Sequence, residues 1–228
     1  MKLLPFDYAA RNAGRNPLRT VLTSAGAAAV IFLVILMGSF VQALGSTLRG
    51  TGDPLNAIIL GTGSEDFLEQ SEIGFDVPTV LAASIPEIAQ HHGTPMISPE
   101  IHHASVVRLS EKEIPDPSNV RMALVRGVTT MAFLVHQQVF LKEGRPPVSG
   151  ELLAGKLAAT KLGLPESALM PGQSIFFEGK SWKVSGIFEA PGTTFEAELW
   201  VPLEDIKIQT KRETLTCAVV RLSDVLGI

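Results

Sequence analysis

Five histidines are the residues of this sequence best suited to chemistry, because imidazole nitrogens bind metals and transfer protons near neutral pH. They are His91, His92, His102, His103 and His136. Adjacent residues of a strand point to opposite faces, so each of the two pairs supplies at most one ligand to a common face. Glu100 lies near the second pair, but the H-x-x-x-H and Cys/His spacings of strong metal motifs are absent from the sequence. We therefore expect no metal site, and we expect the paired histidines to lie in exposed loops.

The sequence contains a single cysteine, Cys217, so it cannot form an intrachain disulfide. Cys217 lies in the apolar run Leu215–Val220, which is typical of a buried strand. A thiol in such surroundings is more often a small structural side chain than a nucleophile or a metal ligand. We predict that Cys217 is buried and unreactive.

Motifs for phosphate binding and hydrolysis are incomplete. Gly61-Thr62-Gly63 lacks the third glycine of a dinucleotide loop, and Glu65 and Asp66 would repel phosphates placed there. The sequence has no G-x-S-x-G elbow and no S-x-x-K motif. The carboxylate pair Glu196 and Glu198 lies in polar sequence, where nothing predicts a raised pKa. We therefore predict that the chain is not an enzyme and has no catalytic, cofactor-binding or metal-binding residues.

Charge is unevenly distributed along the chain. Charged residues make up 18% of the 228 residues, with 19 Lys and Arg against 23 Asp and Glu and a net charge of −4. A typical soluble domain is about 25% charged. Residues 20–48 contain no charged side chain and no histidine. This composition excludes a basic nucleic-acid-binding protein, a disordered acidic tail and a channel with several spans in these residues, and it predicts one apolar segment joined to one globular domain.

The apolar segment predicts a transmembrane helix over residues 20–46. A bilayer core about 30 Å thick needs roughly 20 apolar residues in a helix, and the uncharged run is longer than that. A cleaved signal peptide is one alternative, because Ala43-Leu44-Gly45 resembles a cleavage site, but its apolar region is only about 7–15 residues long. A buried core helix is the other alternative, and such a helix normally carries a polar face.

The charges that flank the apolar segment predict its direction. Residues 1–19 contain Lys2 and three arginines but only one acidic residue, Asp7. The charged residues that follow the segment are mostly acidic. Short basic flanks stay in the cytoplasm. We therefore expect residues 1–19 to be cytoplasmic and residues 49–228 to lie outside the plasma membrane, in the periplasm or extracellular space. Apolar positions at helical spacing within residues 1–19 also predict an amphipathic helix on the membrane surface.

Small side chains are concentrated in the first half of the span, from Ser24 to Ala29. Small residues four positions apart allow two helix backbones to approach closely in lipid. This pattern favours packing against another membrane helix, and ordinary helix composition is the alternative interpretation.

The residues after the span show strand-like and helix-like patterns in mixed order, without an internal repeat. This order predicts an α+β domain rather than a regular βαβ sheet, and about 180 residues can bury an adequate core. We expect strands at residues 56–61, 103–109, 120–128, 174–178, 183–188, 198–202 and 215–222. We expect helices at residues 76–90, 130–139 and 151–162, and from residue 203 onwards.

Several short phrases occur together in an order that is typical of a known family. They are Asn16–Thr23, Gly127-Val128, Leu141–Arg145, Gly150–Leu164, Pro171–Ile175, Trp182–Phe188 and Leu199–Leu203. Each phrase alone is an ordinary turn or strand, but their joint order behind an N-terminal span is specific. Over nearly its whole length the chain resembles the MacB/LolC/FtsX-type permeases of ABC transporters, namely their N-terminal membrane helix and MacB-like periplasmic core domain.

The resemblance implies a permease subunit without catalytic activity of its own. Members of this family couple ATP hydrolysis by an ATPase domain or subunit to movement of the extracytoplasmic domain, and they typically work as dimers with themselves or a paralogous permease. They export or extract substrates such as lipoproteins, peptides or drugs, or regulate cell-wall hydrolases. The partners implied are an ABC ATPase that binds the ATP, the lipid bilayer and a second permease, with no nucleic acid.

One departure from the family pattern concerns the end of the sequence. The family places three further membrane helices and a cytoplasmic coupling segment after the core domain, whereas this sequence ends at Ile228. We therefore expect a fragment, a truncated gene product or a single-span relative. A different class of function stays open as well, in which a single-span anchor holds an extracytoplasmic binding or scaffold domain that works without an ATPase.

Overall fold

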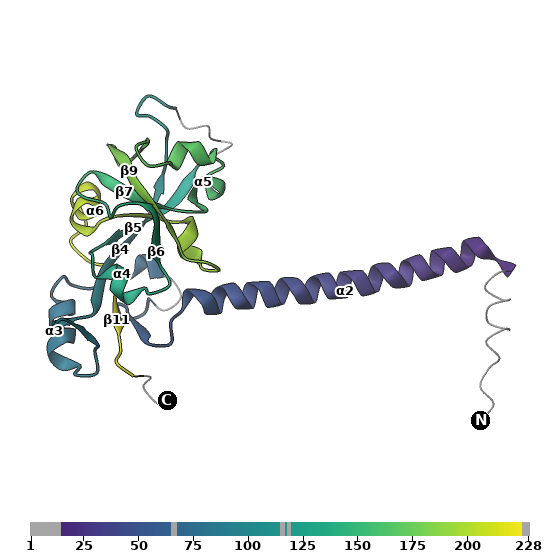
Figure 1. Cartoon of the computed structure of the whole chain (residues 1–228), viewed down its shortest axis with the longest axis horizontal. Helices are drawn as coiled ribbons and strands as arrows, with labels where there is room; N and C mark the ends of the chain where they lie inside the picture. The colour runs from purple at the N-terminus through teal and green to yellow at the C-terminus, as the bar shows by residue number, and fades with distance from the viewer. Residues whose placement is uncertain (1–14, 65–67, 115–116, 118–119, 225–228) are drawn as a thin grey trace. The chain divides into compact units, whose positions relative to one another are not determined.

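The computed structural model describes residues 15–64, 68–114, 117 and 120–224 (Figure 1). The chain divides into two compact units, Met1–Ser46 and Thr47–Ile228. We call the second unit the sheet domain.

The described part of the first unit lies in a long apolar helix. Helix α2 spans Pro17–Thr51, and Pro17 occupies a first-turn position that lacks an intrahelical partner for its nitrogen anyway. Pro17–Gly45 is the one helix among the described residues that is long and apolar enough to cross a membrane. Its large side chains are open on all sides, with Phe32 and Phe40 each 64% exposed. An uncovered apolar helix of this length matches the predicted span, whereas the predicted amphipathic helix lies largely outside the described residues.

The sheet domain is built on one mixed sheet, which confirms the α+β prediction. Among the described residues the sheet has nine strands in the order β1-β11-β4-β5-β10-β7-β9-β6, with β8 paired to β9. The strands are β1 Asn56–Ile59, β4 Ile97–Val106, β5 Met122–Val128, β6 Phe140–Gly144, β7 Glu151–Gly155, β8 Ser174–Phe177, β9 Lys180–Glu189, β10 Leu199–Pro202 and β11 Cys217–Arg221. A separate pair is formed by β2 Gln90–His91 and β3 Thr94–Pro95. The helical segments are η1 Leu68–Gln70, α3 Val77–Ser84, α4 Ala132–Val135, α5 Ala158–Lys161, η2 Glu166–Leu169, η3 Thr194–Ala197 and α6 Leu203–Thr210.

The two faces of the central strands differ in chemistry because side chains alternate along a strand. One face carries aliphatic residues such as Ile101, Val125, Leu199 and Ala218, which form the main core together with Ile206 of α6. The opposite face carries polar residues at the intervening positions of the same strands. We call this face the polar face, because the buried ionisable side chains of the central strands lie on it.

The segment Glu151–Leu162 corrects one prediction. We expect a helix there from its leucine spacing, but the structure has strand β7 followed by the single turn α5. Leu152 and Leu153 are both completely buried, on the two opposite faces of β7. A strand enclosed between β10 and β9 is apolar on both faces. Sequence spacing cannot distinguish that pattern from a helix.

Two other helices are shorter than predicted, and one strand is longer. Helix α3 ends at Ser84 instead of residue 90, because Pro86 disfavours a helical backbone at Ile85, which is extended. Helix α4 covers only four residues of the predicted 130–139. Strand β4 begins at Ile97, six residues before the predicted start, and this places Glu100 and His102 within a strand.

Candidate functional site

Five ionisable side chains meet on the polar face of the sheet. Glu100 and His102 come from β4, Arg126 from β5, Glu198 from the residue before β10, and His136 from the end of α4. All five are buried, and Glu100 is completely inaccessible to solvent. We call these five residues the polar cluster.

The register of the strands explains why these residues meet. Glu100 and His102 are two positions apart in β4, so both point to the same face. Arg126 lies directly across from His102 in the antiparallel β4–β5 pair. Cys217 lies directly across from Glu100 in the β11–β4 pair, which places its thiol beside the cluster. Residues more than a hundred positions apart in sequence therefore become neighbours.

Glu100 is one of the two buried carboxylates of the cluster. Its Oε1 accepts hydrogen bonds from Ser98 Oγ at 2.9 Å and from His136 Nε2 at 2.6 Å, and its Oε2 accepts one from Arg126 Nη1 at 2.5 Å. Burial opposes ionisation of Glu100, but His136, Arg126 and the hydrogen bonds outweigh it and hold the pKa of this carboxyl well below its usual value. Glu100 is therefore a carboxylate at neutral pH.

Arg126 joins the two carboxylates of the cluster. Its Nε and Nη2 donate to the two oxygens of Glu198, each at 2.7 Å, which is the bidentate geometry that arginine favours. The guanidinium also lies over the ring of Phe195, 4.8 Å from its centroid. Burial lowers the pKa of Arg126, but Glu198 and Glu100 outweigh that effect and raise it, so Arg126 is permanently charged.

The contacts of His102 define its tautomer. Its Nε2 lies 2.6 Å from Arg126 Nη1, which can only donate, and 3.0 Å from Glu100 Oε2. A hydrogen on Nε2 would face the guanidinium hydrogens, so Nε2 is the acceptor and the ring proton is on Nδ1. Burial and the neighbouring Arg126 lower the pKa of His102 against the opposing effect of Glu100. His102 is therefore neutral in the folded protein.

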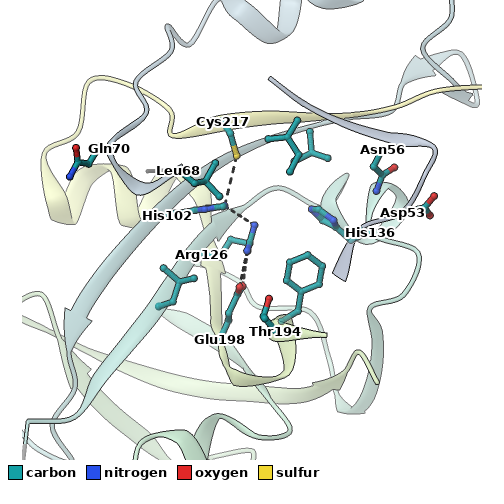
Figure 2. A pocket seen from close by; sticks show the side chains of 15 residues that line it. Asp53, Asn56, Leu68, Gln70, His102, Arg126, His136, Thr194, Glu198 and Cys217 are labelled. Atoms are coloured by element: carbon teal, nitrogen blue, oxygen red, sulfur yellow. Dashed lines mark hydrogen bonds and ion pairs between the residues drawn. The ribbon is translucent and has the colours of Figure 1, made fainter. Parts of the chain in front are cut away.

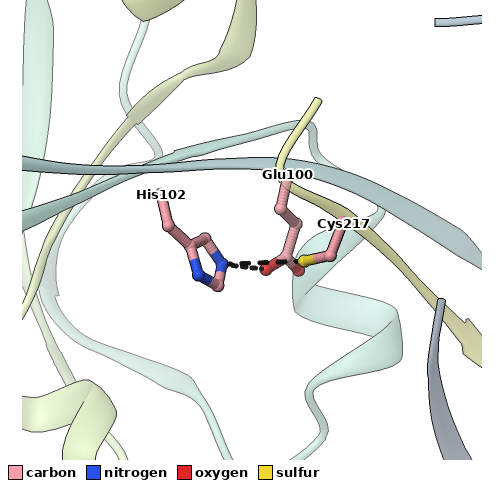
Figure 3. A group of neighbouring side chains, drawn as sticks. All are labelled: Glu100, His102 and Cys217. Carbon is pink, nitrogen blue, oxygen red and sulfur yellow. Dashed lines mark hydrogen bonds and ion pairs between the residues drawn. The ribbon is translucent and has the colours of Figure 1, made fainter. Parts of the chain in front are cut away.

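Glu100, His102 and Cys217 also form a candidate metal-binding group (Figure 3). Their donor atoms lie within 4.8 Å of one another, and Cys217 Sγ is 3.8 Å from His102 Nε2. The only lone pair of His102 Nε2, however, is engaged by Arg126. Burial and the charge of Glu100 also raise the pKa of the Cys217 thiol, whereas metals bind the thiolate. The group therefore fits a metal ion poorly, because Arg126 already supplies the cation.

A cavity of about 500 Å³ opens beside the polar cluster (Figure 2). Its base includes four of the five cluster residues, and its walls are mainly apolar. The walls are formed by Ile58, Leu68, Leu124, Phe195 and Val219, with Asp53, Asn56, Gln70, Thr194 and Cys217 completing the lining together with Gly52. Cavities of 300–1,000 Å³ with apolar walls and a few polar groups are typical of small-molecule sites.

The short helix α4 is fastened beside this cavity by polar contacts. The Val135 carbonyl accepts a hydrogen bond from Asn56 Nδ2 at 2.9 Å, and Arg221 Nη1 lies 3.4 Å from the same oxygen. Arg221 in turn binds Asp53 at 2.8 Å. With His136 bound to Glu100, these contacts connect α4 to β1, β4 and β11.

The structure separates the histidines that the sequence presents as pairs. The expectation of an exposed loop is wrong for His102 and His103, because both lie in strand β4. His102 is buried in the cluster, whereas His103 points to the opposite face, and its Nε2 lies 3.0 Å from Glu178 Oε1. His91 and His92 are exposed at the β2–β3 turn, as expected. The Gly61-Thr62-Gly63 segment is a turn, and Cys217 is buried, as predicted.

Sequence reasoning missed the polar cluster. We expect Glu196 and Glu198 in polar surroundings, but both are buried, since η3 folds them against the sheet. Glu65 and Asp66 lie outside the described residues. The one local signal for the cluster is Glu100-x-His102, because a spacing of two puts both side chains on one face of a strand.

The cluster makes the stability of the sheet domain sensitive to acid. A histidine whose pKa is lowered by folding takes up its proton more readily when unfolded, so stability falls as the pH drops below about 6.5. The lowered pKa of Glu100 adds a second loss at lower pH, as its carboxylate becomes protonated. We expect the free energy of unfolding to fall by about 1 kcal/mol or more between about pH 7.5 and pH 5.5.

Denaturant unfolding followed by tryptophan fluorescence measures this change, because both tryptophans of the chain lie in the sheet domain. His102→Gln should flatten the slope over that interval, since glutamine does not titrate. Equal stability at both pH values in the unmodified chain would contradict the assignment of a neutral His102.

The sheet domain is similar to domains of known proteins. A family model described as the MacB-like periplasmic core domain matches residues 20–226. The periplasmic region of MacB from Actinobacillus actinomycetemcomitans is similar in structure, with a TM-score of 0.54 and 16% identity over 79% of each chain. The extracellular domain of the noncanonic ABC-type transporter YknZ from Gram-positive bacteria has a TM-score of 0.53 and 12% identity over 73% of this chain and 82% of that one. No curated protein matches the chain.

Proposed function

The chain belongs to the family of MacB-like periplasmic core domains, and on this basis we propose that it is the N-terminal portion of an ABC transporter permease. In this role a partner ATPase drives movement of the sheet domain, which exports or extracts a substrate on the outer side of the membrane. The family match over most of the chain is the observation that carries the proposal. The fold and the apolar helix α2 support it, because a permease of this family needs both parts.

The proposed arrangement has three parts. Residues 1–19 are cytoplasmic, residues 20–46 cross the plasma membrane, and residues 49–228 are periplasmic or extracellular. The basic residues before the span and the acidic residues after it support this direction. Placement of the sheet domain outside the membrane also agrees with the family description.

The proposed partners follow from the same role. ATP is bound by a partner ATPase and not by this chain, and a second permease forms a dimer with it. The small residues Ser24–Ala29 support a membrane-helix partner, because they allow close packing in lipid.

Impermeant thiol reagents test the direction of the span. Ser110 and Asn16 are exposed, so cysteines placed there are accessible to a reagent on their own side of the membrane. We expect Ser110→Cys to be labelled on intact cells and Asn16→Cys only after lysis. The native Cys217 serves as an internal control, since its buried thiol with a raised pKa should not react. Labelling of Asn16→Cys on intact cells would contradict the proposed direction.

The cavity favours a second candidate function, in which the anchored sheet domain binds a ligand without an ATPase. A mostly apolar cavity of about 500 Å³ with a polar base is suited to such binding. Isolation of the chain from its native membrane distinguishes the two candidates, because only the permease should be recovered with an ATPase.

A further inference from the structure

We propose that the cavity beside the polar cluster binds an organic cation, namely an ammonium group attached to an apolar body. The apolar walls would cover the body, while the acidic groups at the base and rim would hold the charged head (Figure 2). This inference goes beyond the permease function and does not depend on coupling to an ATPase.

The charge of the cavity base supports a cationic ligand. Glu100 and Glu198 share the single guanidinium of Arg126, so the cluster contains one more carboxylate than guanidinium. Asp53 and Arg221 form a balanced pair at the rim. A buried charge without a full partner is costly, and a bound cation would reduce that cost.

A further arginine, Arg212, lies near His102 but is engaged elsewhere. It donates to the backbone carbonyl of His102 and to Thr216 Oγ1, and it is not among the residues that line the cavity in the described part of the chain. Arg212 is therefore not among the groups that would contact a ligand in the cavity.

The hydrogen bonds at the base also disfavour an anionic ligand. Arg126 already donates from Nε and Nη2 to Glu198 and from Nη1 to Glu100 and His102. These contacts use four of the five N–H groups of the guanidinium, so an anion could accept at most one hydrogen bond from it without breaking another. Asp53, by contrast, lines the cavity with 20% of its side chain exposed and accepts hydrogen bonds from Leu55 and Arg221. Since a carboxylate has about four acceptor sites, Asp53 can still accept from an ammonium group.

A matched series of three eight-carbon ligands tests the proposal: octylammonium, octanol and octanoate. Binding is measured by calorimetry at neutral pH, with the full chain held in an amphipathic polymer. We expect octylammonium to bind about tenfold more tightly than octanol, and octanoate to bind most weakly, because one partly buried charge interaction is sufficient for such a ratio. Equal or tighter binding of octanol or octanoate, or no binding by any of the three, would overturn the proposal.

Two variants locate the binding within the chain. Ile58 lines the cavity and is 55% exposed, so Ile58→Phe should fold, and its added volume should weaken octylammonium binding. Ile208→Phe is the control, because Ile208 is exposed and lies outside the cavity lining. Asp53→Asn should weaken octylammonium binding about threefold or more and leave octanol unchanged, since it removes charge without removing volume. If Ile58→Phe leaves the octylammonium affinity unaltered, the ligand binds elsewhere and the proposal fails.

Discussion

Replacing Arg126 by methionine is expected to lower the free energy of unfolding of the sheet domain by about 3–5 kcal/mol. The reason is that Glu100 and Glu198 would stay buried without the guanidinium that they share. Denaturant unfolding followed by tryptophan fluorescence measures the change. Arg126→Lys should lose less, because it keeps the charge but cannot make the bidentate contact with Glu198.

The control for this variant is Arg145→Met. Arg145 pairs with Glu151 at 2.6 Å, but its side chain is 56% exposed, and exposed pairs contribute only about 0–1 kcal/mol. Similar losses for Arg126→Met and Arg145→Met would contradict the account of the cluster. If Arg126→Met is recovered only unfolded while Arg126→Lys folds with a reduced midpoint, the account is supported.

Trp200→Ala is expected to destabilise the sheet domain by about 3–5 kcal/mol, as is usual when a large buried aromatic side chain is removed. Trp200 is completely buried and lies within 6 Å, centroid to centroid, of the rings of Phe133, Phe188 and Phe195. Its Nε1 also donates to Glu198 at 3.0 Å, so the variant removes one of the donors to that buried carboxylate. Unfolding followed by the remaining Trp182 reports the loss.

Phe140→Ala is the matched control for Trp200→Ala. Phe140 lies on the edge strand β6 and is 48% exposed, so its truncation should cost much less than that of Trp200. A loss for Trp200→Ala as small as that for Phe140→Ala would show that the aromatic packing around Trp200 contributes little to the stability of the sheet domain.

The elements that sequence reasoning predicts well are those with a clear local signal. The apolar span, the strand at residues 56–61 and the final strand through Cys217 each show a continuous apolar run, and each is present. The helix prediction for residues 151–162 is wrong because a strand buried on both faces can have the same leucine density as a helix. Tertiary surroundings decide between the two, and they are not visible in the local pattern.

The polar cluster is harder to predict because its five members come from four separate segments. Only the register between β4, β5 and β11 brings Arg126 and Cys217 beside Glu100 and His102. Strand register depends on long-range pairing, so the sequence shows the participants without their contacts. One of the family phrases, Gly150–Leu164, carries part of the information on long-range contacts. An added Cβ at Gly155 would lie only 2.4 Å from the Glu196 backbone oxygen, so this glycine allows β7 to pack closely against η3.

The polar cluster also bears on how the domain could work. Its hydrogen bonds and ion pairs join β4, β5, the entry to β10 and the end of α4. Buried hydrogen-bonded networks can rigidify a fold. A rigid sheet domain is suited to being moved as one body, which is what the proposed coupling to an ATPase requires.

The central claim is that the chain works as part of an ABC transporter permease. The most direct test is affinity purification of the tagged protein from its native membrane in a mild detergent, followed by mass spectrometry of what is recovered with it. The account predicts recovery of an ATPase whose sequence contains the G-x-x-x-x-G-K-[ST] phosphate-binding loop. Recovery of the folded protein without any such ATPase would contradict the account and favour an anchored binding domain.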